Sequence, residues 1–123
     1  MTSSTESGSI TLLGVGDVGP LHEPVDHYAA HVKDTLATGD IRFAQCEKIY
    51  SEGGSMVLHS NGHYSRMPQR AASVFDDCGF NVVSVASNHL MDWGPDALKD
   101  TMDMFHDKGV QTVGGGAQYR GGP

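Results

Sequence analysis

The sequence lacks several features that would quickly assign it to a class of proteins. It has no cluster of Lys and Arg, and its formal net charge is −7. Both observations argue against nucleic-acid binding, whose usual signature is a basic patch. No apolar run approaches the length of about 18 residues that would predict a membrane-spanning helix. The polar segment 1–8 has neither the basic nor the apolar region of a signal peptide, so a cytoplasmic location is the default expectation.

Cysteine is also scarce, whereas histidine is frequent. Cys46 and Cys78 are far apart and lie in apolar contexts, which predicts two buried free thiols rather than a disulfide framework or a metal site. Among the seven histidines, His27 and His31 are four residues apart and would share one face of a helix, where they could hold a metal. No third ligand accompanies them at a fixed offset, so exposed imidazoles are the favoured interpretation.

Apolar segments alternate with amphipathic ones along the whole chain. We expect strands at 9–15, 40–46, the start of 81–94, and 110–113, with helices that begin near Pro24, Pro68 and Pro95 and end at Gly39, Gly79 and Gly109. The first strand is apolar enough to be interior. The order βαβαβαβ predicts an α/β fold with right-handed crossovers and a mainly parallel sheet.

One domain is expected over residues 9–118, with a polar tail at 1–8 and a loop at 119–123. The stretch 48–67 is rich in Gly, Ser, His and Asn, and a loop of this length inside a compact domain is usually functional or a lid. The short apolar run 55–58 within it is a candidate edge strand.

Polar side chains of the kind that bind ligands follow three of the expected strands. Asp17 follows the first, Glu47 the second, and Asn88 and His89 the third, with Asp92 one turn later. Parallel strands direct their carboxyl ends to one edge of a sheet, so these side chains should converge there. Asn88 and Asp92 could instead cap the next helix, but the shared edge makes this alternative weaker.

A nucleotide site and a metal site could both use such an edge. Gly14–Gly19 fits the dinucleotide-binding pattern G-x-G-x-x-G. However, Pro20 follows it and helical periodicity begins only near Pro24, so no helix N-terminus would face a pyrophosphate. The nucleotide-binding interpretation is therefore the weaker one.

The metal site is favoured by the chemistry of the side chains. Asp17, Glu47 and Asn88 offer hard oxygen ligands and His89 offers an imidazole, a mixture suited to Mn, Mg, Fe or Zn ions in hydrolysis. Two such ions would bind a phosphate and generate a hydroxide nucleophile near neutral pH. His89 could donate a proton to the leaving oxygen, and Asp92 could hold its ring.

Residues 82–98 resemble the signature of the bacterial capsule synthesis family, the poly-γ-glutamate biosynthesis group within the calcineurin-like metallophosphatase superfamily. Its specific element, N-H-x-x-D-[YW]-G, is matched from Asn88 to Gly94. Three further segments are similar to the family: 110–117 to its G-A-G segment, 10–18 to its opening strand ending in G-D, and Cys46-Glu47 to its N-x-E. The resemblance extends over about residues 9–118.

The resemblance implies that Asp17, Glu47 and Asn88 are metal ligands. His89 would be the acid or charge-stabilising group, with Asp92 behind it. The fold would be the N-terminal half of an α/β/β/α sandwich. The sequence departs from the family in two places. Ser87 replaces the first Asn of the signature, and Gln45-Cys46 replaces the Asn-Leu before Glu47.

Members of the family are considerably longer, and their second half carries a further glutamate and an H-x-H segment that complete the metal site. This sequence contains no H-x-H. We therefore expect an incomplete domain whose missing second half is a partner, with little or no hydrolase activity alone. The family implies phosphoester or polyglutamate substrates, a possible membrane synthase partner and possible cell-envelope association. The alternative is a non-catalytic binding or partner domain that supports polyglutamate or capsule synthesis.

Overall fold

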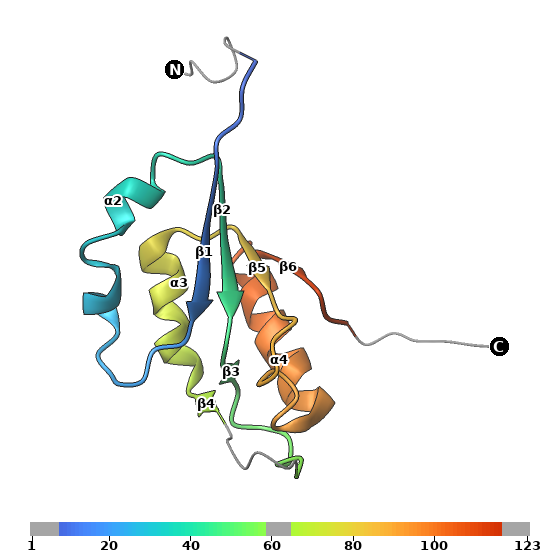
Figure 1. Cartoon of the computed structure of the whole chain (residues 1–123). Helices are drawn as coiled ribbons and strands as arrows, with labels where there is room; N and C mark the ends of the chain where they lie inside the picture. The colour runs from blue at the N-terminus through green and yellow to red at the C-terminus, as the bar shows by residue number, and fades with distance from the viewer. Residues whose placement is uncertain (1–7, 59–64, 117–123) are drawn as a thin grey trace, which may run out of the picture.

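The computed structural model describes residues 8–58 and 65–116, and the expectations for most of the 1–8 tail and for 119–123 lie outside them. The chain adopts an α/β fold with a mainly parallel sheet, as predicted (Figure 1). Four strands pair in the order β1-β2-β5-β6, and every pair is parallel. These strands are β1 (Leu12–Val18), β2 (Ile41–Cys46), β5 (Val82–Ser84) and β6 (Gln111–Val113). The helical elements are η1 (Asp26–Ala29), α2 (Lys33–Leu36), η2 (Gln69–Ala72), α3 (Ser73–Cys78) and α4 (Gly94–Asp107).

The first strand differs from its prediction in extent and in position. An interior strand was expected at 9–15, but β1 runs from Leu12 to Val18 and lies at the edge of the sheet. Its register on β2 shifts between Gly14 and Asp17, as at a β-bulge. The interior position was wrong because apolar composition indicates a strand but not how many neighbours it has. Asp17 consequently lies within the strand, one residue before its end.

The first expected helix is broken into two short pieces, η1 and α2. Val25, Ala29 and Leu36 of its predicted inner face are buried, but Tyr28 and Val32 are exposed. A helix in a protein depends largely on packing along its apolar face, and this face is only partly covered. Gly39 is not in the left-handed conformation that was expected. A Cβ at this position would instead lie 2.9 Å from the Leu13 side chain, so close approach requires the glycine.

The two later helices agree better with the sequence. Gly79 and Gly109 follow α3 and α4 with φ of 71° and 79°, the left-handed stops that were predicted. None of the described helices is long and apolar enough to cross a membrane.

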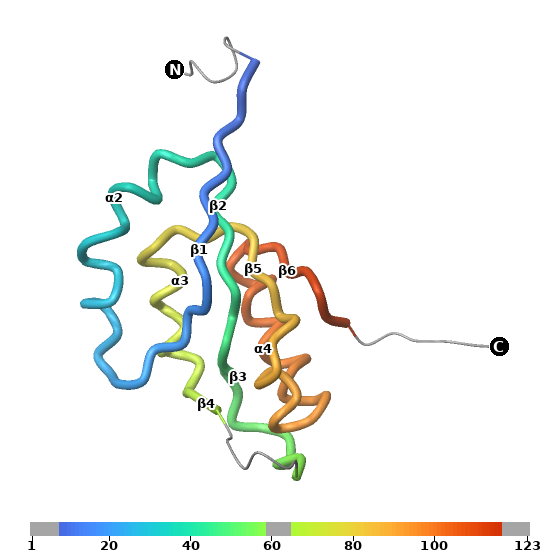
Figure 2. Tube along the Cα trace, viewed as in Figure 1, coloured from blue at the N-terminus to red at the C-terminus, as the bar shows by residue number. Residues whose placement is uncertain are grey.

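The predicted edge strand at 55–58 is absent from the described part of the loop. Its backbone is instead bonded to the turn before α4, because Ser55 and Val57 donate to the carbonyls of Trp93 and Asp92. The loop contributes two other short strands, β3 (Ile49–Tyr50) and β4 (Arg66–Met67), which pair with each other in parallel. The trace in Figure 2 shows β3 running next to α4, and the two elements are in contact.

The two faces of the sheet are covered unequally. Each connection steps in the same direction across the sheet order, so right-handed crossovers place the helices on one face. On that face Ala44 and Val83 are fully buried. On the opposite face Leu12 and Val113 remain 62% and 46% exposed, and Phe43 is half-buried. None of the described helices covers this second face, on which the apolar side chains alternate with Gln45, Ser84 and Gln111.

An aromatic cluster joins the helices to the strands. The rings of Phe75 and Phe105 meet edge to face at a centroid distance of 4.9 Å, and Tyr50 packs against both. All three side chains are fully buried. Cys46 and Cys78 are also buried and both are free, which confirms the prediction of two core thiols.

Cys46 gives this core a pH-dependent contribution to stability. Burial raises the pKa of its thiol from 9.0 to about 12. The folded state therefore holds the proton more tightly than the unfolded chain. The contribution is complete below pH 9.0 and is lost as the pH rises towards 12. Relative to Cys46→Ala, the unfolding free energy of the wild type should fall by up to about 1.4 kcal/mol per pH unit in that window. Urea denaturation of both proteins at several pH values measures this difference. If the unfolding free energies of the wild type and Cys46→Ala fell equally as the pH rises, the contribution could not be assigned to Cys46.

Candidate active site

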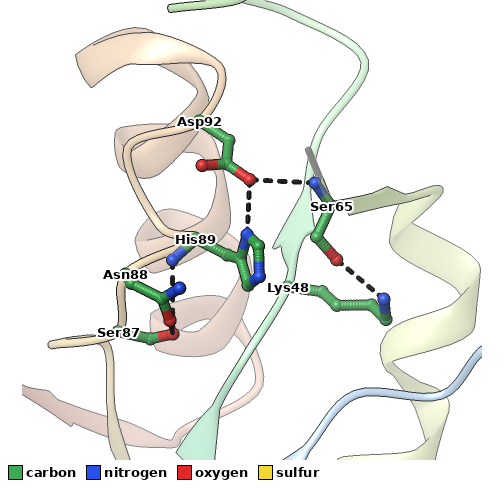
Figure 3. A network of polar contacts seen from close by, with 6 residues as sticks. All are labelled: Lys48, Ser65, Ser87, Asn88, His89 and Asp92. Carbon is green, nitrogen blue, oxygen red and sulfur yellow. Dashed lines mark hydrogen bonds and ion pairs between the residues drawn. The ribbon is translucent and has the colours of Figure 1, made fainter. Parts of the chain in front are cut away.

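The centre of the site is a histidine held by a buried carboxylate. His89 Nδ1 lies 2.6 Å from Asp92 Oδ2, and the two side chains are 16% and 1% exposed (Figure 3). Both belong to the tight turn between β5 and α4, in which Asp92 N–H donates to the His89 carbonyl at 3.1 Å. A carboxylate can only accept, so Nδ1 carries the hydrogen. Nε2 makes no hydrogen bond within the described part of the chain.

Asp92 is also bonded from a second direction. The Ser65 N–H donates to Asp92 Oδ2 at 2.9 Å, so one carboxylate oxygen receives both a backbone amide and an imidazole. A buried carboxylate must be compensated by such donors. The pairing fixes the orientation of the His89 ring and the side on which Nε2 is presented.

The alternative in which Asn88 and Asp92 only cap the next helix is wrong. The N-cap of α4 is Trp93, whose side chain makes no capping hydrogen bond, and the Asp92 carboxylate is bonded to His89 and to the Ser65 amide. Asn88 is exposed and contacts Ser87 Oγ at 3.4 Å. Neither side chain serves the helix end, so both are available to the site.

The expected carboxylates of the first two strands lie at the same end of the sheet. Asp17 pairs in register with Gln45, and Glu47 N–H continues the ladder by donating to the Val18 carbonyl at 3.2 Å. A Cβ built at Gly19 would lie only 2.8 Å from Glu47 Oε2. The glycine is therefore needed for the Glu47 carboxylate to occupy its position against the backbone.

The donor atoms fit a hard divalent cation, but the described residues supply few of them. Carboxylate oxygens from Asp17 and Glu47 and the amide oxygen of Asn88 are ligands that Mn²⁺ or Mg²⁺ would accept. Across residues 8–58 and 65–116, no three His, Cys, Asp or Glu side chains form a group that could hold a metal. A complete coordination shell would therefore require donors beyond these side chains.

The described part of the long loop packs directly on the turn that carries His89 and Asp92. Gly54 has a φ of 75°, and a Cβ there would lie 2.2 Å from the Trp93 carbonyl oxygen. The guanidinium of Arg66 stacks over the Trp93 ring at 3.8 Å from its centroid. The loop therefore supports the site from one side, whereas His59 and His63 lie outside the described residues.

Sequence reasoning missed two residues of the site, Ser65 and Lys48. Ser65 Oγ accepts a hydrogen bond from Lys48 Nζ at 2.7 Å, and its backbone amide is bonded to Asp92. No sequence pattern singled out Ser65, because it lies in a loop whose path is set by tertiary contacts. The only signal for Lys48 was its place directly after Glu47.

The two weaker interpretations can also be compared with the structure. His27 and His31 are exposed, as favoured, and they do not share one helix, because His27 lies in η1 whereas His31 lies in the turn between η1 and α2. Gly14 and Gly16 lie inside β1, and the next helical element begins only at Asp26. No glycine turn therefore leads from the strand directly into a helix, in agreement with the rejection of a dinucleotide site.

Comparison with known proteins assigns the chain to a family. Residues 11–121 match the family described as bacterial capsule synthesis protein PGA_cap. The chain belongs to this family. The match includes the turn with His89 and Asp92 and both carboxylates, Asp17 and Glu47.

Individual relatives agree with the family assignment. The capsule biosynthesis protein CapA of Bacillus anthracis is 25% identical over an alignment that covers 94% of this chain and 30% of that protein. The uncharacterized protein y4sH of Sinorhizobium fredii is also 25% identical, over 94% of this chain and 27% of its own length. The chain thus spans less than a third of the length of these curated relatives.

Proposed function

We propose that this domain contributes part of the active site of a metal-dependent hydrolase of the phosphoesterase type. The observation that carries the proposal is the His89–Asp92 pair at 2.6 Å, in the turn that follows β5 of a parallel sheet. Asp17 and Glu47 lie at the carboxyl ends of β1 and β2 in the same sheet. Open α/β sheets bind their ligands at this edge. In this proposal, the uncovered face of the sheet would receive a second sheet, as the metallophosphatase-like sandwich requires.

In this proposal His89 performs the proton transfer. Asp92 accepts the Nδ1 hydrogen, which leaves Nε2 as the atom that gives a proton to, or takes one from, the leaving oxygen. The bond from the Ser65 amide prevents the Asp92 carboxylate from turning away from the ring. The ring is thus held in one orientation before substrate arrives.

Asp17, Glu47 and Asn88 would hold the metal in this proposal. A bound divalent cation supplies a nucleophile near neutral pH and neutralises charge on a phosphoryl oxygen. The chain's own contribution is to place two carboxylates on neighbouring strands, with Gly19 leaving room for Glu47. Asp17 and Asn88 are exposed and so are accessible to an ion and its ligands.

A second candidate is a non-catalytic binding or partner domain in capsule or polyglutamate synthesis. The observation that favours it is the lack of a group of three His, Cys, Asp or Glu side chains in the described ranges. Such a domain would keep the fold and the His89–Asp92 pair as structural features only. Dependence on metal separates the two candidates.

Metal titration provides the test. Calorimetry with Mn²⁺ on a version extended to the length of the curated relatives should show saturable binding. Asp17→Ala should weaken it by about tenfold or more, because a ligand to the ion is lost. Asp34→Ala is the matched control, since this exposed carboxylate lies on α2 away from the sheet edge. Equal affinity of Asp17→Ala and the wild type would rule out the proposed ligand set and favour the partner domain.

A further inference from the structure

A lysine links the two sides of the candidate site. Lys48 directly follows Glu47, and its Cε would lie 3.4 Å from a Cβ at Gly19, the same glycine that makes room for Glu47. At its other end, Nζ donates to Ser65 Oγ at 2.7 Å. Ser65 in turn donates its backbone amide to Asp92. Figure 3 shows the resulting chain of contacts from Lys48 through Ser65 to Asp92 and His89.

The ammonium group of Lys48 has unused binding capacity. A lysine has three donor hydrogens, and Ser65 Oγ is the only polar partner of Nζ among the described residues. Other lysines with a bonded ammonium are paired with carboxylates: Lys99 with Asp103 and Lys108 with Asp76. The Lys48 side chain is also partly buried. Within residues 8–58 and 65–116, no carboxylate forms an ion pair with this ammonium group.

We propose that Lys48 is an oxyanion-binding residue, which receives a phosphate or carboxylate oxygen of the ligand next to the His89–Asp92 pair. Two donor hydrogens of Nζ point to the oxyanion and the third stays on Ser65, which orients the ammonium. Charge-assisted hydrogen bonds of this kind are the strong ones. The inference rests on the proposed function in one respect, because it takes the ligand of this edge to be anionic.

The test uses the 123-residue chain without added metal. Inorganic phosphate and glutarate are titrated separately at constant ionic strength, and NMR follows the Lys48 side-chain amine and the Ser65 amide. Saturable shifts at both groups are expected with at least one anion. The anion that binds more tightly identifies the substrate as a phosphoester or as a carboxylate-bearing chain. Absence of saturation with both anions would overturn the proposal.

Three variants assign the binding to the ammonium. Lys48→Met should weaken binding by about tenfold or more, the loss expected when charge-assisted hydrogen bonds are removed. Lys48→Arg should retain binding, and Lys99→Met, which removes a charge paired with Asp103, should leave it unchanged. Unchanged affinity in a folded Lys48→Met protein would also overturn the proposal. Neither metal nor turnover is involved, so this result is independent of the metal titration that tests the proposed function.

Discussion

Phe105→Ala should lower the free energy of unfolding by about 3–5 kcal/mol, the usual cost of deleting a fully buried aromatic side chain. Phe105 is fully buried on α4 and packs edge to face on Phe75 and Tyr50. Its removal leaves a cavity at the point where α4 is anchored to the rest of the domain. Domains of this size are stable by only about 5–15 kcal/mol, so the change would consume much of the total. Urea denaturation followed by circular dichroism measures it.

Tyr50→Phe is the matched control within the same cluster. The Tyr50 hydroxyl is buried and has no hydrogen-bond partner in the part of the chain that the structure describes, so its removal should change stability by less than about 1 kcal/mol or increase it. Phe105→Leu, which keeps most of the volume, should cost distinctly less than Phe105→Ala. A loss in Tyr50→Phe as large as in Phe105→Ala would show that the cluster is not packed as described.

The positions of the strands along the chain could be predicted from the sequence because they depend on local signals. Apolar runs indicated three of the four strands at nearly their observed places, and Gly79 and Gly109 marked the ends of two helices correctly. What local signals do not contain is the number of neighbours of a strand. The apolar β1 was therefore expected inside the sheet, although it lies at the edge with Leu12 exposed.

The sequence predicted those residues of the candidate site that lie at the ends of strands. Asp17 and Glu47 were placed on neighbouring strands because parallel topology brings the carboxyl ends together. Contacts between segments far apart in the sequence were not predictable. Ser65 reaches Asp92 only because β4 pairs with β3 and returns the chain to the turn. The proposed role of Lys48 in binding an oxyanion likewise depends on its contact with Ser65 and not on a sequence motif.

The difference between local and long-range signals also applies to the uncovered face of the sheet. Alternation along β2 places Ala44 under the helices and Phe43 on the open side, so one strand carries both a core face and a second apolar face. Large exposed apolar surfaces on a domain usually mark an interaction site. The uncovered face is therefore a candidate interaction surface.

His89→Ala should lower kcat by about 10²- to 10⁴-fold, the range for loss of a general acid–base group. The assay uses a phosphodiester substrate and Mn²⁺ with a version extended to the length of the curated relatives. Mn²⁺ affinity should stay close to that of the wild type, because His89 Nδ1 is bonded to Asp92 and the proposed function assigns the ring to the leaving oxygen and not to the metal. The control is His31→Ala, which removes an exposed imidazole in the connection between β1 and β2. Asp92→Asn should give a smaller kcat loss with an altered pH profile, since it changes only the orientation and charge around the ring.

If His89→Ala lost metal affinity and kcat in equal measure, His89 would be a ligand rather than the proton donor, and the division of roles along this turn would have to be reversed.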